Sequence, residues 1–371
     1  MLIKKITEKE GRRMNFDWSV NHYNYQDRIG NLQTRASGIV KSDKFFPIFL
    51  TKEGSKKVFK PLSKTKPLST PYFAYSEVFW STVIHDYFDS QTPIYRLATC
   101  KDIETEYPNK YHHGTEVDLL EKSDQKIVNL YEVFEKHPEE NVNIKDYINF
   151  CEKFYDYQTI LNSEWLQENP NLQNQLAYQV LLSILRLDQN FHYENVLWWE
   201  KDDQITSIVP TLDHEFSTMF LYLDQLKINK ERLNRGLSSL CAPKEKEGDI
   251  FAPFYYQAFA VLAKNLDWIT TNCPDISILF LENLKKWLHD LKREPFQLEN
   301  QGYLTPFNSE NFVIGQALYK QNNPELAIRL KEKIPQYNPE LRMINQVVYE
   351  EVLLASETLK TEIEKRLIKL P

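Results

Sequence analysis

The sequence predicts an α+β protein in two parts, a small β-rich unit followed by a larger helical unit. Two strand-like apolar runs joined by a turn, Phe45–Leu50 and Val58–Lys60, precede a single long helix. After about residue 125, most segments carry apolar residues at helical spacing, and only an apolar hairpin over Val196–Val209 interrupts them. We therefore expect three segments: an N-terminal arm (1–33), a β-rich lobe (34–124) and a helical lobe (125–371).

The composition describes an ordinary globular protein of 371 residues, of which 42% are hydrophobic. The net charge of −7 does not indicate a basic surface of the kind that binds nucleic acid, so we expect no direct nucleic-acid binding. The N-terminus lacks the apolar segment of a signal peptide, and no apolar run reaches the length of a membrane span. We expect a cytoplasmic protein without a membrane partner, and secretion without a cleaved signal peptide is left open. The four cysteines form no CxxC pair, which favours reduced thiols.

The arm is polar and aromatic with weak periodicity, so we expect irregular structure there. In the β-rich lobe, two further strands are expected at residues 93–98 and 114–120. The intervening helix has a clear start, because Thr70 can cap it and Pro71 suits its first position. It is expected to run to about Phe88.

The helical lobe is expected to contain helices throughout, apart from the hairpin. Apolar residues recur at helical spacing in each of them. Asn338 followed by Pro339 predicts the start of the last helix. The expected helices cover residues 126–137, 143–161, 172–187, 254–269, 275–291, 311–321 and 340–370.

Lys60 and Glu77 are candidate nucleotide-binding residues. Lys60 ends a strand, where its ammonium can neutralise phosphate oxygens as a point charge. Neighbouring lysines make a solvated surface the ordinary alternative. Glu77 lies on the following helix among large apolar residues, and a carboxylate tolerates such burial only when it is paired. An ion pair between the two is therefore expected. Upstream, Ser37 and Gly38 could present backbone N–H groups to phosphate, although a plain turn explains them equally well.

Asn195 and Asp213 flank the hairpin and are candidate metal ligands. An amide oxygen and a carboxylate suit Mg²⁺, which keeps several waters and takes its other ligands from phosphate. The ordinary alternatives are an asparagine in a turn and an aspartate that caps a loop. His192, in the loop before the hairpin, is interpreted as an architectural histidine and not as a base.

Taken together, these residues resemble the HipA-like and CtkA-like kinase family, distant relatives of phosphoinositide and protein kinases. The family loop reads Asp-x-His-x-x-Asn, followed by a hairpin and Pro-x-x-Asp. Here Asn190–Asn195 and Pro210–Asp213 match that frame. Val58–Pro61 resembles the family's lysine strand, and Glu77 stands where the paired glutamate is expected. The resemblance covers about residues 34–220, and it implies a bilobal protein-kinase-like fold that carries its metal site on the hairpin.

The sequence departs from the family at the catalytic aspartate, which falls on Asn190. An amide cannot accept the proton of a substrate hydroxyl as a carboxylate does. Asp188 stands two residues earlier, and residues two apart in an extended chain point to the same side. Three outcomes are open: Asp188 is the base, Asn190 orients the hydroxyl with little need of a base, or transfer has been lost.

The resemblance implies an ATP- and Mg²⁺-dependent kinase that phosphorylates a serine or threonine hydroxyl of a protein, and in several members a toxin or effector role. An antitoxin or host-protein partner is left open. Two alternatives remain. Asn190 favours a pseudokinase that binds nucleotide without transfer, and a kinase acting on a small molecule or lipid is compatible with the same metal ligands.

Overall fold

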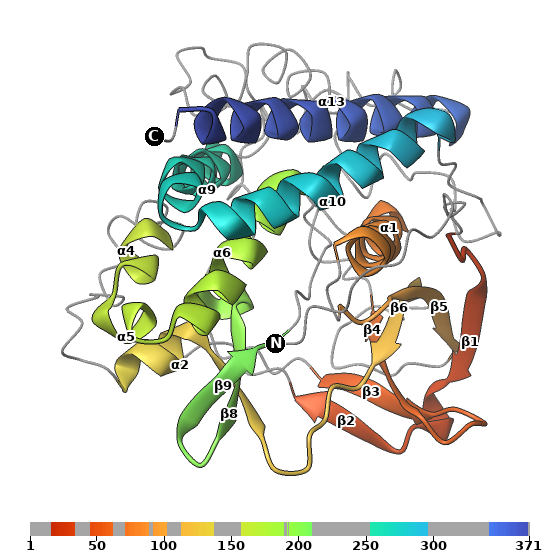
Figure 1. Ribbon diagram of the computed structural model, residues 1–371. Helices are drawn as coiled ribbons and strands as arrows, with labels where there is room; N and C mark the ends of the chain where they lie inside the picture. Colours follow the sequence, from red (N-terminus) through yellow and green to blue (C-terminus); the bar gives the residue numbers. More distant parts are fainter. Residues whose placement is uncertain are drawn as a thin grey trace, which may run out of the picture.

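The computed structural model describes residues 16–33, 45–61, 71–88, 92–101, 113–136, 157–188, 191, 193–209, 253–295 and 341–369. Over these residues the protein is a mixed α/β structure with one six-stranded and one three-stranded sheet. Helix α1 (Pro71–Tyr87) lies between the larger sheet and α10 (Pro274–Arg293), and α6 (Pro170–Leu185) lies beside the smaller sheet (Figure 1).

The larger sheet has the strand order β1-β5-β6-β4-β3-β2. β1 pairs with β5 in parallel, and the other neighbours are antiparallel. The four strands that the sequence predicted for this lobe are present with bounds shifted by a few residues. The six strands are β1 (Val20–Asn24), β2 (Gly30–Gln33), β3 (Phe45–Leu50), β4 (Lys56–Pro61), β5 (Arg96–Lys101) and β6 (His113–Asp118).

Two of these strands lie in the segment expected to be an irregular arm. β1 and β2 form the two edges of the sheet, so over residues 20–24 and 30–33 the expectation of irregular structure is wrong. Both strands are short, and β1 is only half-buried, so neither shows the apolar alternation that identifies a strand from sequence. Their structure comes from pairing with β5 and β3, which sequence periodicity does not reveal.

Helix α1 (Pro71–Tyr87) connects the larger sheet to the helical part of the chain. It contacts β5 and β6 on one side and α10 on the other. Every side chain from Ala74 to Ile84 is buried, which agrees with a helix held between two layers. The helix predicted from Pro71 is confirmed, while Thr70, its predicted cap, lies outside the described residues.

The smaller sheet has the order β7-β8-β9 and contains the predicted hairpin. β8 (Leu197–Lys201) and β9 (Gln204–Ile208) are joined by a two-residue turn in which Asp202 and Asp203 both have positive φ. Positive φ at both central residues gives a turn that matches the twist of the strands.

The third strand of this sheet corrects the expectation of a helix over residues 126–137. Lys126–Asn129 form β7, and the helix α2 covers only Leu130–Glu135. Asn129 ends the strand and caps the helix, since its side chain accepts a hydrogen bond from the backbone N–H of Glu132 at 2.8 Å. The apolar run before Asn129 fits a strand as well as a helix, and the cap decides where one ends and the other begins.

The remaining helices enclose the main hydrophobic core. α6 and α10 cross beneath α13, and α9 packs beside them (Figure 1). Trp287 of α10 is fully buried and contacts the rings of Phe79 and Tyr87 on α1. None of the described helices is both long and apolar enough to cross a membrane. The helices are α4 (Tyr157–Leu161), α5 (Glu164–Gln167), α6 (Pro170–Leu185), α9 (Pro253–Asn272), α10 (Pro274–Arg293) and α13 (Leu341–Leu367).

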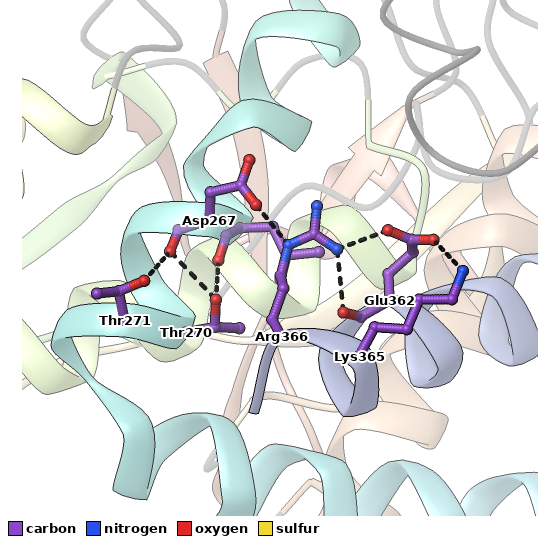
Figure 2. A network of polar contacts seen from close by, with 7 residues as sticks. Asp267, Thr270, Thr271, Glu362, Lys365 and Arg366 are labelled. Atoms are coloured by element: carbon purple, nitrogen blue, oxygen red, sulfur yellow. Dashed lines mark hydrogen bonds and ion pairs between the residues drawn. The ribbon is translucent and has the colours of Figure 1, made fainter. Parts of the chain in front are cut away.

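A polar network joins α9 to the end of α13 (Figure 2). Arg366 donates to Asp267 of α9 at 2.6 Å and to Glu362 of its own helix at 2.5 Å. Partial burial raises the pKa of Glu362, but the hydrogen bonds from Arg366 and Lys365 outweigh it and lower that pKa. The network fixes the C-terminal helix on the bundle that in turn supports α1.

Candidate functional site

Lys60 and Glu77, predicted as an ion pair, meet between the larger sheet and α1. β4 carries the lysine and α1 carries the glutamate, and Lys60 Nζ lies 2.5 Å from Glu77 Oε1. The Glu77 side chain is 2% exposed, whereas that of Lys60 is 18% exposed. The carboxylate is therefore enclosed, while the lysine side chain is partly exposed. A role of this pair in nucleotide binding stays a prediction.

Thr115, which sequence reasoning missed, binds the second oxygen of the same carboxylate. It lies on β6 directly opposite Lys60 in the register of the two strands. Its hydroxyl donates to Glu77 Oε2 at 2.5 Å. Both carboxylate oxygens of Glu77 thus have partners, which a buried charge requires. A threonine in a strand carries no signal of this role, because the contact depends on the pairing of β4 with β6.

Gly114 allows β4 and β6 to approach closely beside this pair. A Cβ built on Gly114 would collide with the backbone oxygen of Lys60 and would lie 2.8 Å from Cζ of Phe59. Any larger residue would therefore push β4 away at the position that carries the lysine. Here the glycine is needed for space and not for an unusual backbone angle.

On the opposite face of β6, Glu116 holds the strand to β1. Asn21 Nδ2 donates to Glu116 Oε1 at 2.8 Å, and the Tyr23 hydroxyl donates to the other oxygen. Burial and this bond to Glu116 raise the pKa of Tyr23. Because neighbouring strand residues alternate in direction, Thr115 and Glu116 fix the same strand from both sides. The sequence signal for this contact is the spacing of Asn21 and Tyr23, which places two polar groups on one side of a strand.

The loop that begins after α6 starts with a defined turn. Asp188 N donates to Ser183 O at 3.0 Å and Leu187 N donates to Ile184 O at 3.1 Å, the hydrogen bonds of a Schellman motif. Leu187 has φ 54°, a left-handed conformation usually taken by glycine. The chain therefore turns at Leu187, directly before Asp188, and a role of Asp188 as the base stays a prediction.

Asp188 forms an ion pair with Arg186 inside the protein. Arg186 NH2 lies 2.6 Å from Asp188 Oδ2, and the two side chains are 0% and 3% exposed. Arg186 also donates to the hydroxyl of Ser183 at 3.1 Å. The carboxylate proposed as a base is thus engaged with a guanidinium away from solvent. An arginine at the end of an apolar helix was a signal for such a pair, since buried arginines are almost always paired.

The backbone of the loop is anchored by Tyr157 of α4. Its hydroxyl donates to the carbonyl of Phe191 at 3.2 Å, and its ring packs against Phe191 and Tyr193. Residues Tyr193–Asn195 then form a short 3₁₀ turn that leads into β8. Asn195, a predicted Mg²⁺ ligand, is half-buried in this turn. The loop is therefore held at both ends of the segment in which His192 lies.

Several predicted site residues lie outside the described part of the chain. Among the described residues, no group of three or more His, Cys, Asp or Glu could hold a metal ion. Of the two predicted Mg²⁺ ligands, the structure describes Asn195 and not Asp213. An amide and a carboxylate suit Mg²⁺ chemically, because this ion takes its remaining ligands from water and phosphate. The residues outside the described ranges are Ser37, Gly38, Asn190, His192 and Asp213.

Comparison with solved structures finds several chains with a structural likeness to this one. No family model matches the sequence. No curated protein sequence matches it either. The crystal structure of the proinflammatory kinase CtkA of Helicobacter pylori aligns with 94% of this chain and 99% of its own. The two are 10% identical, with a TM-score of 0.43.

Proposed function

We propose that this chain is a kinase-type phosphotransferase that uses ATP and Mg²⁺. The observation that supports it is the Lys60–Glu77 pair, in which a buried carboxylate with partners on both oxygens fixes a partly exposed lysine. A lysine fixed in this way is the group that kinases use to bind nucleotide phosphates. Because phosphoryl transfer depends mainly on positioning and charge neutralisation, a fixed cation contributes directly to it.

In this proposal Lys60 binds phosphate oxygens of ATP and Glu77 keeps the lysine in place. Asn195 and Asp213 would hold Mg²⁺, which neutralises phosphate charge when bound. Ser37 and Gly38 would contribute backbone N–H groups. The finer part of the proposal is a HipA-like enzyme that acts on a serine or threonine hydroxyl of a protein, with a toxin or effector role.

The test is transfer of label from γ-labelled ATP to the protein itself or to proteins of a lysate. We expect Lys60→Met to lower the labelling rate by about 100-fold, the usual effect of removing one transition-state partner. Lys56→Met is the matched control, because Lys56 lies on the same strand but pairs with the exposed Glu121. Wild-type protein that labels nothing above an Asp213→Ala background would contradict transfer, and equal effects at Lys56 and Lys60 would contradict the role of the pair.

A second candidate is a pseudokinase, and the Arg186–Asp188 pair favours it. With Asp188 engaged by a buried guanidinium, the base would have to come from position 190, where this chain has an amide. Binding of ATP and Mg²⁺ in a thermal-shift measurement without transfer would support this function. Gain of transfer in Asn190→Asp would identify the missing base. Labelling of lipid or metabolite extracts alone would instead favour a small-molecule or lipid acceptor.

A further inference from the structure

Thr115 occupies a place from which it can control Glu77. It is 1% exposed, so its hydroxyl is enclosed by the protein. Its Oγ1 lies 2.5 Å from Oε2 of Glu77, while Lys60 Nζ lies at the same distance from Oε1. The two contacts reach the carboxylate from neighbouring strands, β6 and β4. The orientation of the carboxylate therefore depends on one contact at each of its two oxygens.

From this geometry we propose that Thr115 is a positioning residue that holds Glu77 in the orientation in which Oε1 faces Lys60. The inference rests on the proposed function, in which Lys60 binds nucleotide phosphates. A glutamate carboxylate rotates readily about its last bond, because that torsion is broad. A threonine side chain, in contrast, is stiff at χ1. The Thr115 hydroxyl thus fixes the orientation of the Glu77 carboxylate, which the lysine, with its flexible stem, does not.

The strand that carries Thr115 is itself held on both sides. Glu116, the next residue, is bound by Asn21 and Tyr23 of β1 on the opposite face. Gly114, the preceding residue, lets β6 approach the backbone of Lys60. Thr115 therefore projects from a backbone that is fixed relative to β4. A displacement of its hydroxyl would have to break contacts on both faces of the sheet.

The test measures the chemical reactivity of Lys60 in the full-length protein, which needs no assumption about activity. Trace acetic anhydride acetylates unprotonated amines, and peptide mass spectrometry gives the rate at Lys60 relative to Lys56. An adjacent carboxylate favours the protonated, unreactive form of a lysine. We expect Thr115→Val to raise this ratio about fivefold, the effect of losing one hydrogen bond of ordinary strength. Thr115→Ser keeps a hydroxyl and should stay within about twofold of wild type.

Two comparisons separate positioning from a general effect on the fold. Thr99→Val removes a hydroxyl of the same sheet that contacts His22 instead, and it should leave the ratio unchanged. In a Glu77→Gln background, which raises the ratio by itself, Thr115→Val should add nothing, because the two residues act through one contact. Thr115→Ala removes the same hydroxyl without adding a methyl group and provides the readout if Thr115→Val does not fold.

The proposal is overturned if Thr115→Val leaves the ratio unchanged, if Thr115→Ser raises it equally, or if the effect persists fully in Glu77→Gln. ATP with Mg²⁺ should also protect Lys60 of wild type, at a concentration that Thr115→Val raises about fivefold. Absence of protection in wild type contradicts the proposed function and leaves the reactivity comparison standing. The two failures are therefore distinguishable.

Discussion

Two of the ion pairs in the described part of the chain have a buried carboxylate but differ in the exposure of the cation. Lys60 and Glu77 are 17 residues apart and come from a strand and a helix, whereas Arg186 and Asp188 are two residues apart at the end of one helix. The cation of the first pair is 18% exposed and that of the second is fully buried. In the first pair the carboxylate is enclosed and the cation stays reachable, while the second encloses both charges.

The difference in exposure of the two cations agrees with a ligand-binding role proposed for Lys60–Glu77 and a structural role for Arg186–Asp188. A lysine is a compact cation on a flexible stem and can serve a ligand, whereas a buried arginine is permanently charged and must be satisfied where it lies. Arg186 and Asp188 therefore fix the start of the loop, and the proposed role of Lys60 and Glu77 is to offer a charge to a ligand. The predictions below test this contrast, beginning with the largest expected effect.

Arg186→Met should destabilise the protein strongly. The substitution leaves the Asp188 carboxylate buried without its guanidinium, which should lower the free energy of unfolding by about 3–5 kcal/mol. Urea denaturation measures it. Arg186→Met combined with Asp188→Asn removes both charges and should recover a large part of the loss. If the single variant loses less than about 1 kcal/mol of unfolding free energy, the pair contributes no more than a surface ion pair does. The contrast with Lys60–Glu77 would then not hold.

Gly114→Ala should displace β4 at Lys60. The new Cβ would meet the Lys60 carbonyl oxygen and the Phe59 ring, and overpacking of this kind costs about 1–3 kcal/mol. Gly30→Ala is the matched control, since no atom lies within 4 Å of its Cβ position. It should stay within about 1 kcal/mol of wild type. Equal unfolding free energies for the two variants would mean that β6 can move away from β4 without cost.

Glu77→Gln should lower the free energy of unfolding by about 1–2 kcal/mol, because it removes a charge-assisted contact from an enclosed site. Glu121→Gln breaks the pair with Lys56, in which both side chains are about half exposed. Such a pair contributes about 0–1 kcal/mol and is screened by salt. Urea denaturation at low and high salt distinguishes the enclosed Lys60–Glu77 pair from the exposed Lys56–Glu121 pair. A strong salt dependence at Glu77 would show that water reaches the pair.

The Lys60–Glu77 pair could be predicted from sequence because its signals are local. A lysine ends a strand, and a glutamate stands among apolar residues on the next helix, where burial demands a partner. The same reasoning missed Thr115 and Gly114, whose roles depend on the register between β4 and β6. Sheet register is a property of paired strands, and neither strand carries it alone.

The turn before Asp188 could not be predicted in this way. The positive φ of Leu187 and the capping hydrogen bonds of α6 turn the chain at that point, and Arg186 then binds the carboxylate. A leucine in a left-handed conformation is uncommon, so the residue type at this position does not predict the turn. In the same way, the sequence predicts a helix where the structure has β7, because a short apolar run fits either element.

Glu200 on β8, in the same part of the molecule as the Arg186 pair, allows the comparison of ion pairs to be tested by changing the pH. Its side chain is 0% exposed and lies 2.6 Å from Nζ of Lys126 and 2.5 Å from Nζ of Lys136, both of which reach solvent. Burial raises the pKa of this carboxyl, but the hydrogen bonds from the two lysines outweigh it and hold the pKa below the ordinary value of 4.5. A carboxylate with a lowered pKa stabilises the folded state above that ordinary value.

Glu200→Gln should therefore be less stable than wild type near neutral pH, by less than Glu77→Gln, because exposed lysines are screened by solvent. The difference in unfolding free energy should shrink as the pH falls below 4.5 through the folded pKa, where wild type also becomes protonated. Urea denaturation over a series of pH values measures it. Asp203→Asn is the control, since this acid near the same lysines is 86% exposed. A difference that widens on acidification would mean that burial, and not the two lysines, sets the pKa of Glu200.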